Sequence, residues 1–199
     1  VCVGMLEVDN NLVLAGGLAE FPDNPNYKHN LIKLDQNDPF LRLSMALWNL
    51  RENSIFYGLY RTKNIKPIGL RDGIAGDWLT VAAMVVVGKV LMSDRTRLYR
   101  ASGDGASQNH KHTVKLLGLP KWQGYFLKLV IALNFRRFFL QDYSTNSLSP
   151  EECREMANHT FLVALSRKKI FRFLLHFILP ERRPEHVWHV VDLSASKKF

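Results

Sequence analysis

Residues 78–87 form an almost wholly apolar run, WLTVAAMVVV, and a carboxylate, Asp77, stands directly before it. Asp is among the best residues to cap a helix, because its side chain accepts the free N–H groups of the first turn. Gly88 follows the run, at the point where a helix end favours a residue that can adopt positive φ. The sequence therefore predicts a short buried helix over residues 78–87, capped by Asp77, around which the remaining segments must pack.

The position of Asp77 has two interpretations, and the sequence alone leaves both open. As a cap, the carboxylate only stabilises the helix. As a chemical group, the same carboxylate is held rigidly at the edge of the core, where the N-terminal helix dipole keeps it ionised.

Length and charge limit the classes of protein to consider. A chain of 199 residues can form one sizeable core, or one domain with an appendage. Its formal net charge of +9 indicates an anionic partner such as a phosphate-bearing substrate, an acidic lipid or nucleic acid. The two cysteines, Cys2 and Cys153, are too few for a disulfide framework, so a reducing compartment is expected. No membrane-spanning helix is predicted, because basic residues interrupt the longest apolar runs.

The first half of the chain reads as mixed α/β. Residues 1–8 and 12–14 are rich in β-branched and apolar side chains around a turn, which predicts a hairpin, and a loop is expected from Gly16-Gly17 through 21–26. A helix is expected to start at Asp38-Pro39 and to end near 51–54, followed by an extended segment at 55–61 in which Gly58 permits close approach. A loop is expected from 62 to 76. After the apolar helix, the sequence predicts short strands at 89–92 and 97–100 around a turn at 93–95, and then a surface loop at 102–110.

The second half reads as helical and basic. Residues 122–141 are apolar nearly all round, and the capping-box pattern from Ser149 to Glu152 opens a long amphipathic helix toward Phe177. A strand or turn is expected at 187–193. The change in composition at Leu119 predicts two parts, residues 1–118 and residues 119–199.

Four segments occur in an order that carries a family resemblance: DPFLR at 38–42, YGLYR at 57–61, GDW at 76–78 with the apolar run to Lys89, and LYR at 98–100. In this order the sequence resembles the C-terminal, acceptor-side half of the catalytic domain of inverting, family-two-type glycosyltransferases, which have the GT-A fold. The resemblance covers roughly residues 1–112. It implies the fold class α/β, as a partial GT-A-like mixed α/β fragment followed by a helical C-terminal extension.

The resemblance also implies an activity. Such enzymes transfer a sugar from a nucleotide diphosphate sugar to the hydroxyl of a glycan or lipid-linked acceptor with inversion, here as expected for bacterial surface glycans. An Asp at the position of Asp77 acts as the general base, because the acceptor hydroxyl must lose its proton as it attacks the anomeric carbon. The substrate-binding residues implied by the family pattern are Tyr57, Gly58, Arg61 and Trp78 on the acceptor side, Arg100 at the diphosphate, and His110 in second rank.

The chain departs from the family pattern in one large respect. The nucleotide-binding half and its Asp-x-Asp metal motif are expected before Val1, so Mg or Mn would be held mainly by upstream ligands and no metal ligand is expected here. The Gln-x-x-Arg-Trp signature of processive polysaccharide synthases does not occur. We therefore expect this chain alone to bind no nucleotide sugar and to catalyse no turnover. The expected location is cytoplasmic, with peripheral contact to the inner face of the membrane left open.

Other interpretations concern the histidines and the basic C-terminal part. His110 and His112 lie in a polar stretch without cysteines or clustered carboxylates, which is more typical of solvated side chains than of a metal site. The basic helical part either packs on the α/β part or lies on an anionic membrane surface. Nucleic acid is not expected as a partner, because no recognition motif is present. The alternative function is therefore a non-catalytic basic module that docks on an anionic membrane or a protein partner through Arg167, Lys168, Lys169 and Arg172.

Overall fold

The computed structural model describes the chain except for residues 25–30, 50–52, 101–109, 144–147 and 167–199. Its sheet has four strands in the order β2-β4-β1-β3. Strands β1 (Leu12–Glu20) and β4 (Lys89–Tyr99) are long and parallel, whereas the short strands β2 (Lys33–Leu34) and β3 (Leu59–Tyr60) lie antiparallel at the edges. The structure is therefore mixed α/β.

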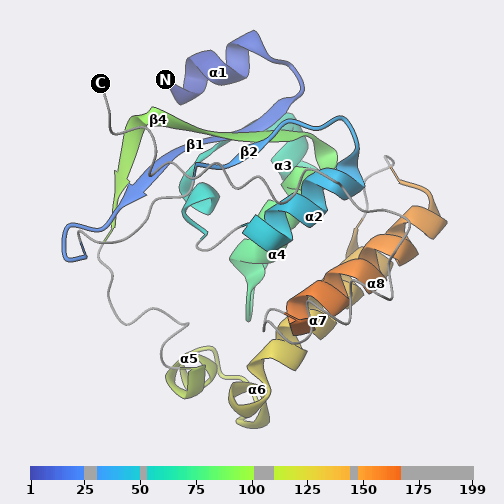
Figure 1. The fold of residues 1–199 in the computed structure, drawn as a ribbon. Helices are drawn as coiled ribbons and strands as arrows, with labels where there is room; N and C mark the ends of the chain where they lie inside the picture. The colour runs from blue at the N-terminus through green and yellow to red at the C-terminus, as the bar shows by residue number, and fades with distance from the viewer. Residues whose placement is uncertain (25–30, 50–52, 101–109, 144–147, 167–199) are drawn as a thin grey trace.

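Helices cover the sheet in layers (Figure 1). Helix α1 (Cys2–Val8) lies on one side of the strands, and α2 (Pro39–Asn49) and α4 (Gly76–Val87) lie on the other. Beyond them lie α7 (Leu127–Arg137) and α8 (Pro150–Ser166). The remaining helical segments are a 3-10 turn (Ser54–Tyr57), α3 (Thr62–Ile68), α5 (His110–Leu116), α6 (Trp122–Tyr125) and a π-helical turn (Phe138–Asp142).

The main hydrophobic core joins the sheet to α2, α4, α7 and α8, on the side of the strands away from α1. Helix α4 is at its centre, with Ala83, Met84 and Val85 fully buried. On one side α4 faces Leu14 of β1, and the same cluster continues to Phe138 beyond α7. The predicted buried helix is thus confirmed as the element that the other layers contact.

The predicted start signals of α2 and α8 are confirmed. The Asp38 carboxylate accepts the backbone N–H of Phe40 at 2.8 Å where α2 begins. At the start of α8, the Ser149 N–H donates to Glu152 Oε2 at 2.7 Å and the Glu152 N–H donates to Ser149 Oγ at 3.2 Å, which is the reciprocal capping box. Residues 122–141 are helical, as predicted, in α6, α7 and the π-helical turn.

The N-terminal hairpin prediction is wrong, because residues 2–8 form helix α1. The guanidinium of Arg61 donates to the carbonyls of Leu6 and Asp9 at the end of α1, and to the carbonyl of Leu12 at the start of β1. A distant side chain thus satisfies carbonyls that a helix end leaves free. The β-branched residues of α1 are therefore helical although their intrinsic propensity favours a strand.

The loop predicted at Gly16-Gly17 is also wrong, because β1 continues to Glu20. A Cβ on Gly16 would lie 2.6 Å from Ile55 Cδ1, and one on Gly17 would lie 2.8 Å from the Thr96 carbonyl oxygen. The glycines therefore permit close packing within a strand rather than a turn. The two short strands predicted at 89–92 and 97–100 are one strand, β4, whose pairing with β1 shifts between Ser93 and Arg97.

Two details of the central helix differ from the prediction. Ala75 precedes α4 in the left-handed conformation, and Asp77 lies one residue inside the helix, where its Oδ1 accepts the adjacent N–H of Trp78 at 2.9 Å. Asp77 is therefore a first-turn residue and not the N-cap. Gly88 has an extended backbone, φ −169°, and is required because a Cβ would lie 2.7 Å from the Asn11 carbonyl oxygen.

Three connecting predictions have different outcomes. The loop expected at 62–76 contains α3, whose Ile68 is buried in the core. The extended segment at 55–61 is half 3-10 turn and half β3. His110 begins α5 rather than ending a loop, and the rest of that predicted loop, together with residues 167–199, lies outside the described residues.

Candidate functional site

The half-buried Asp77 lies near the segment between the 3-10 turn and β3. Tyr60 of β3 is half-buried and donates its hydroxyl to the Phe56 carbonyl at 2.7 Å. Burial raises the pKa of Tyr60 above its ordinary value, and the negative charge of Asp77 raises it further. The Tyr60 phenol is therefore a neutral hydrogen-bonding group close to the carboxylate.

Backbone packing fixes the position of this segment. A Cβ on Gly58 would lie 2.5 Å from the Ala15 carbonyl oxygen, so only glycine allows the chain to approach β1 this closely. The close approach predicted for Gly58 is confirmed, and the partner is the backbone of β1. Tyr57, beside Gly58, is 60% exposed, so its ring is available to a ligand.

Arg100, directly after β4, joins the same region. Its backbone N–H donates to the Glu20 carbonyl at 2.9 Å, which continues the pairing of β4 with β1. Its guanidinium donates to Ser54 Oγ at 3.0 Å and lies 5.0 Å from the centre of the Tyr57 ring. A pocket of about 340 Å³ opens beside it, lined by Pro22, Asp23, Tyr99 and Arg100. The sequence-predicted residues Tyr57 and Arg100, which are 43 positions apart, are thus in contact.

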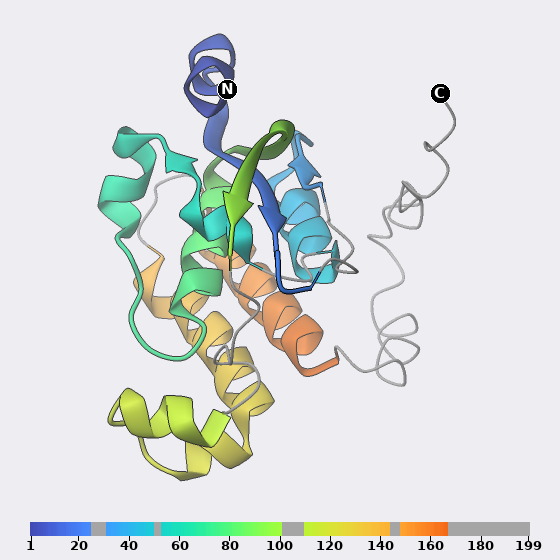
Figure 2. The same cartoon turned by 90° about the vertical axis from the view of Figure 1, so that its left-hand side faces the viewer.

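The other predicted site residues lie elsewhere. Arg61 points to the α1 end of β1, where it binds backbone carbonyls. Trp78 is half-buried and packs against the main core. His110 begins α5, which lies with α6 at the end of the molecule away from the sheet in both ribbon views (Figures 1 and 2).

A second, polar pocket of about 410 Å³ lies at the opposite end of α4. Since α4 rises 1.5 Å per residue, the ten positions from Asp77 to Val87 separate the two regions by about 15 Å. The lining residues are mainly basic and carboxamide side chains together with the end of α4: Asn10, Asn11, Val13, Gln36, Asn37, Arg42, Lys63, Asn64, Val87, Gly88 and Lys89.

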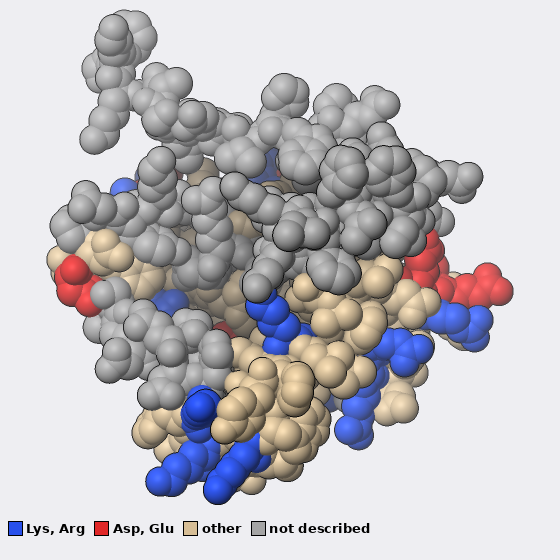
Figure 3. Space-filling view, turned by 60° about the horizontal axis from the view of Figure 1, so that its bottom comes forward, with Lys and Arg blue, Asp and Glu red and all other residues tan. Residues whose placement is uncertain are grey.

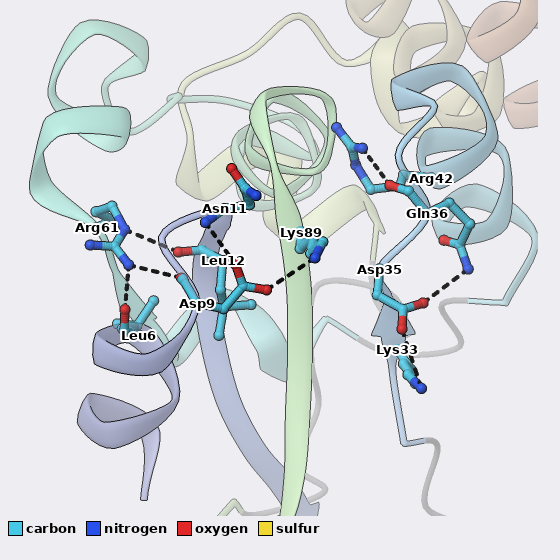
Figure 4. A network of polar contacts seen from close by, with 10 residues as sticks. All are labelled: Leu6, Asp9, Asn11, Leu12, Lys33, Asp35, Gln36, Arg42, Arg61 and Lys89. Atoms are coloured by element: carbon cyan, nitrogen blue, oxygen red, sulfur yellow. Dashed lines mark hydrogen bonds and ion pairs between the residues drawn. The ribbon is translucent and has the colours of Figure 1, made fainter.

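Two of the three basic side chains at this pocket, Arg42 and Lys89, are held by hydrogen bonds or an ion pair (Figure 4). The buried Arg42 donates through Nε to the Val85 carbonyl and through a terminal nitrogen to the Val86 carbonyl, both at 2.8 Å. It thereby satisfies two free carbonyls at the C-terminus of α4. Lys89 lies 3.1 Å from the Asp9 carboxylate. A hydrogen bond from the backbone of Asn11, followed by that from Lys89, lowers the pKa of Asp9.

Sequence reasoning did not find this pocket or the role of Arg42. Arg42 also donates to the nearby carbonyls of Gln36 and Asn37, but its acceptors on α4 lie 43 and 44 positions away, so local spacing does not predict the contact with α4. The one available signal was a basic residue at a helix position otherwise expected to face the core. We interpret Arg42 as a structural residue of the pocket wall.

Comparisons with known proteins give no relative. No protein-family model, curated protein or solved structure matches the chain. Function is therefore argued from the residues alone.

The described residues do not fit a metal site. Among them, no group of three or more His, Cys, Asp or Glu side chains is placed to hold a metal ion. Within the same part of the chain, no helix combines the length and the apolarity needed to cross a membrane.

Proposed function

We propose that the chain is the acceptor-side half of an inverting glycosyltransferase, in which Asp77 is the general base. One observation carries the proposal: a half-buried carboxylate on the first turn of the central apolar helix, beside a tyrosine that its charge affects. The core around α4 holds this carboxylate in one place, as a base for a bound hydroxyl requires.

The proposed sugar transfer requires one proton transfer to a residue of this chain. The acceptor oxygen forms a bond to the anomeric carbon, the bond from that carbon to the diphosphate oxygen breaks, and the nucleotide diphosphate leaves with the electron pair. The acceptor proton passes to a carboxylate oxygen of Asp77.

Arg100 and Tyr57 support the same proposal. A guanidinium binds phosphate oxygens through two parallel N–H groups, and its contact with Tyr57 holds it beside the exposed ring on the proposed acceptor side. The proposal assigns no metal to the described residues, and no step depends on one.

The test compares Asp77→Asn with Asp72→Asn in the complete protein, including its donor half. Asp72 is an exposed carboxylate five positions earlier and is the matched control. Loss of a general base lowers kcat by roughly 10²- to 10⁴-fold. We expect this loss for Asp77→Asn with an unfolding free energy within about 1 kcal/mol of the parent protein, and no loss for Asp72→Asn.

Two results would contradict the proposal. The first is full transferase activity in the Asp77→Asn protein. The second is tight binding of a nucleotide diphosphate sugar to this chain alone in a calorimetric titration, because donor binding is expected to reside upstream.

A further inference from the structure

Residues 110–141, which form α5, α6, α7 and most of the π-helical turn, carry charge of only one sign. The stretch contains six basic side chains and no Asp or Glu. The chain as a whole has 27 basic and 18 acidic residues, so carboxylates are otherwise common. The basic residues are Lys111, Lys115, Lys121, Lys128, Arg136 and Arg137.

The same stretch exposes unusually large apolar side chains. Leu116 is 77% exposed, Trp122 is 50%, Tyr125 is 67% and Phe126 is 59%. Single exposed apolar residues are ordinary, but a group of large ones on adjoining helices marks an interaction surface. Lys111 Nζ lies 4.8 Å from the centre of the Tyr125 ring, so a basic and an aromatic group of adjoining helices are in contact. We call these four apolar residues, together with Lys111, Lys115, Lys121 and Lys128, the docking face.

Helix α7 extends the docking face as a stripe. Leu129 and Leu133 follow Phe126 at helical spacing and are 39% and 43% exposed. The opposite side of α7 is buried through Phe135, which belongs to the main core. The apolar stripe of a helix normally faces a covering layer. Its outer side therefore lacks a covering layer among the described residues.

The docking face rests on a rigid base. Val114 of α5 and Val130 of α7 form a small second core with Ile74, two positions before α4. The side-chain amide of Asn134 donates to the Ile74 carbonyl at 3.1 Å. The face is thus fixed to the end of the central helix that carries Asp77.

We propose that the docking face lies on an anionic lipid bilayer. Trp and Tyr favour the interface between water and hydrocarbon, Leu and Phe enter its apolar side, and lysines reach out to acidic headgroups. Figure 3, which views the α5–α6 end, shows basic side chains distributed among uncharged ones there, while the prominent carboxylates lie at the edges of the view.

The charge and the side-chain types of the docking face favour a membrane over the other possible occupants. A second copy of the face would bring two sets of cations together without carboxylates to neutralise them, which opposes self-association. Single-stranded nucleic acid is held by aromatic stacking, whereas exposed leucines contribute none. The inference does not depend on transferase activity, because it uses neither Asp77 nor Arg100.

The experiment measures sedimentation of the full chain with vesicles of phosphatidylcholine, with and without about one-third phosphatidylglycerol. One variant carries Lys115→Gln, Lys121→Gln and Lys128→Gln. Each basic residue near an anionic surface adds to the binding free energy, so removing three should lower partitioning onto the anionic vesicles roughly a hundredfold. A second variant, Trp122→Ser with Phe126→Ser, should lose at least about tenfold, from the apolar area withdrawn from the bilayer.

Matched controls change equivalent exposed residues elsewhere. Lys63→Gln, Lys66→Gln and Arg95→Gln remove the same charge, and Val8→Ser with Leu70→Ser removes exposed apolar groups. These proteins should bind anionic vesicles as the parent does. Trp122→Phe should also bind, but without the part of the blue shift in tryptophan emission that Trp122 supplies on entering the bilayer.

Several outcomes would overturn the proposal. Equal binding to neutral and anionic vesicles would exclude charge recognition. Binding that neither docking-face variant reduces would place the membrane contact elsewhere, for example at Arg167–Arg172 in the sequence. Absence of vesicle binding, with a dimer that Trp122→Ser and Phe126→Ser abolish, would assign the face to a second copy.

Discussion

At the scale of single residues, His159 of α8 is the buried titratable group with the clearest consequence. Its Nε2 lies 2.9 Å from Ser44 Oγ on α2, and its ring centre lies 4.6 Å from that of Phe40. Burial lowers the pKa of His159 to about 4. The neutral ring therefore links α8 to α2, and its protonated form is disfavoured in the folded protein.

His159 should make the protein sensitive to acid. Because its pKa is about 4 when folded and near 6.5 when unfolded, its stabilising contribution is complete above pH 6.5 and decreases as the pH falls toward 4. The loss should be about 3 kcal/mol. His159→Gln, which cannot titrate, should flatten the pH dependence of the unfolding free energy measured by urea denaturation over this interval. His112→Gln, on exposed α5, should retain the slope, and an unchanged slope in His159→Gln would refute the assignment.

The candidate site illustrates which residue roles a sequence can reveal. Asp77 was selected because a carboxylate beside an apolar run is a local pattern, and Tyr57 and Arg100, which are in contact in the structure, because each lies in a short motif. Two of the four hydrogen bonds of Arg42, and those of Arg61, go to carbonyls more than 40 positions away. No spacing within one helix could have predicted these roles.

At the scale of secondary-structure elements, the successful predictions are those whose stabilising contacts are local. The bonds that begin α2 and α8 close within three residues. The errors concern elements whose conformation depends on distant partners: α1 on Arg61, and β4 on its parallel partner β1. The pair Gly16-Gly17 was predicted as part of a loop, although in β1 these glycines permit close packing against Ile55 and Thr96.

The junction between α4 and β4 provides a test of this explanation. Gly88 has φ −169°, which any residue can adopt, so Gly88→Ala introduces only a steric conflict. The new Cβ would lie 2.5 Å from Val13 Cγ1 and 2.7 Å from the Asn11 carbonyl oxygen. We expect a loss of roughly 2–3 kcal/mol in the free energy of unfolding, measured by denaturant titration.

Gly4→Ala is the matched control for Gly88→Ala. A Cβ at Gly4 meets no atom within 4 Å, and Gly4 lies inside α1. This replacement should stabilise the protein by up to about 1 kcal/mol through helix propensity. If both variants have the stability of the parent protein, the close approach at Gly88 does not restrict the side chain.

At the scale of the whole molecule, the main core connects parts that composition separates. The predicted boundary at Leu119 divides a mixed α/β part from a helical part. The core cluster, however, includes Leu43 of α2 and Met84 of α4 together with Phe135, Phe139 and Met156 from beyond that boundary. All of these side chains are at most 2% exposed. Water would therefore reach the outer side of α2 and α4 if α7 and α8 were absent.

Truncation of the chain tests how the molecule is divided. A protein of residues 1–118 would expose the α2–α4 surface, and each large apolar side chain uncovered costs roughly 1.5–3 kcal/mol. Because a domain is stable by only about 5–15 kcal/mol, we expect this protein to show no cooperative thermal transition and to bind a hydrophobic dye. Residues 1–166 retain every core side chain that the structure describes and should unfold in one transition. A cooperative transition in residues 1–118 would instead show two separable domains, since it requires a core that closes without Phe135, Phe138 and Phe139.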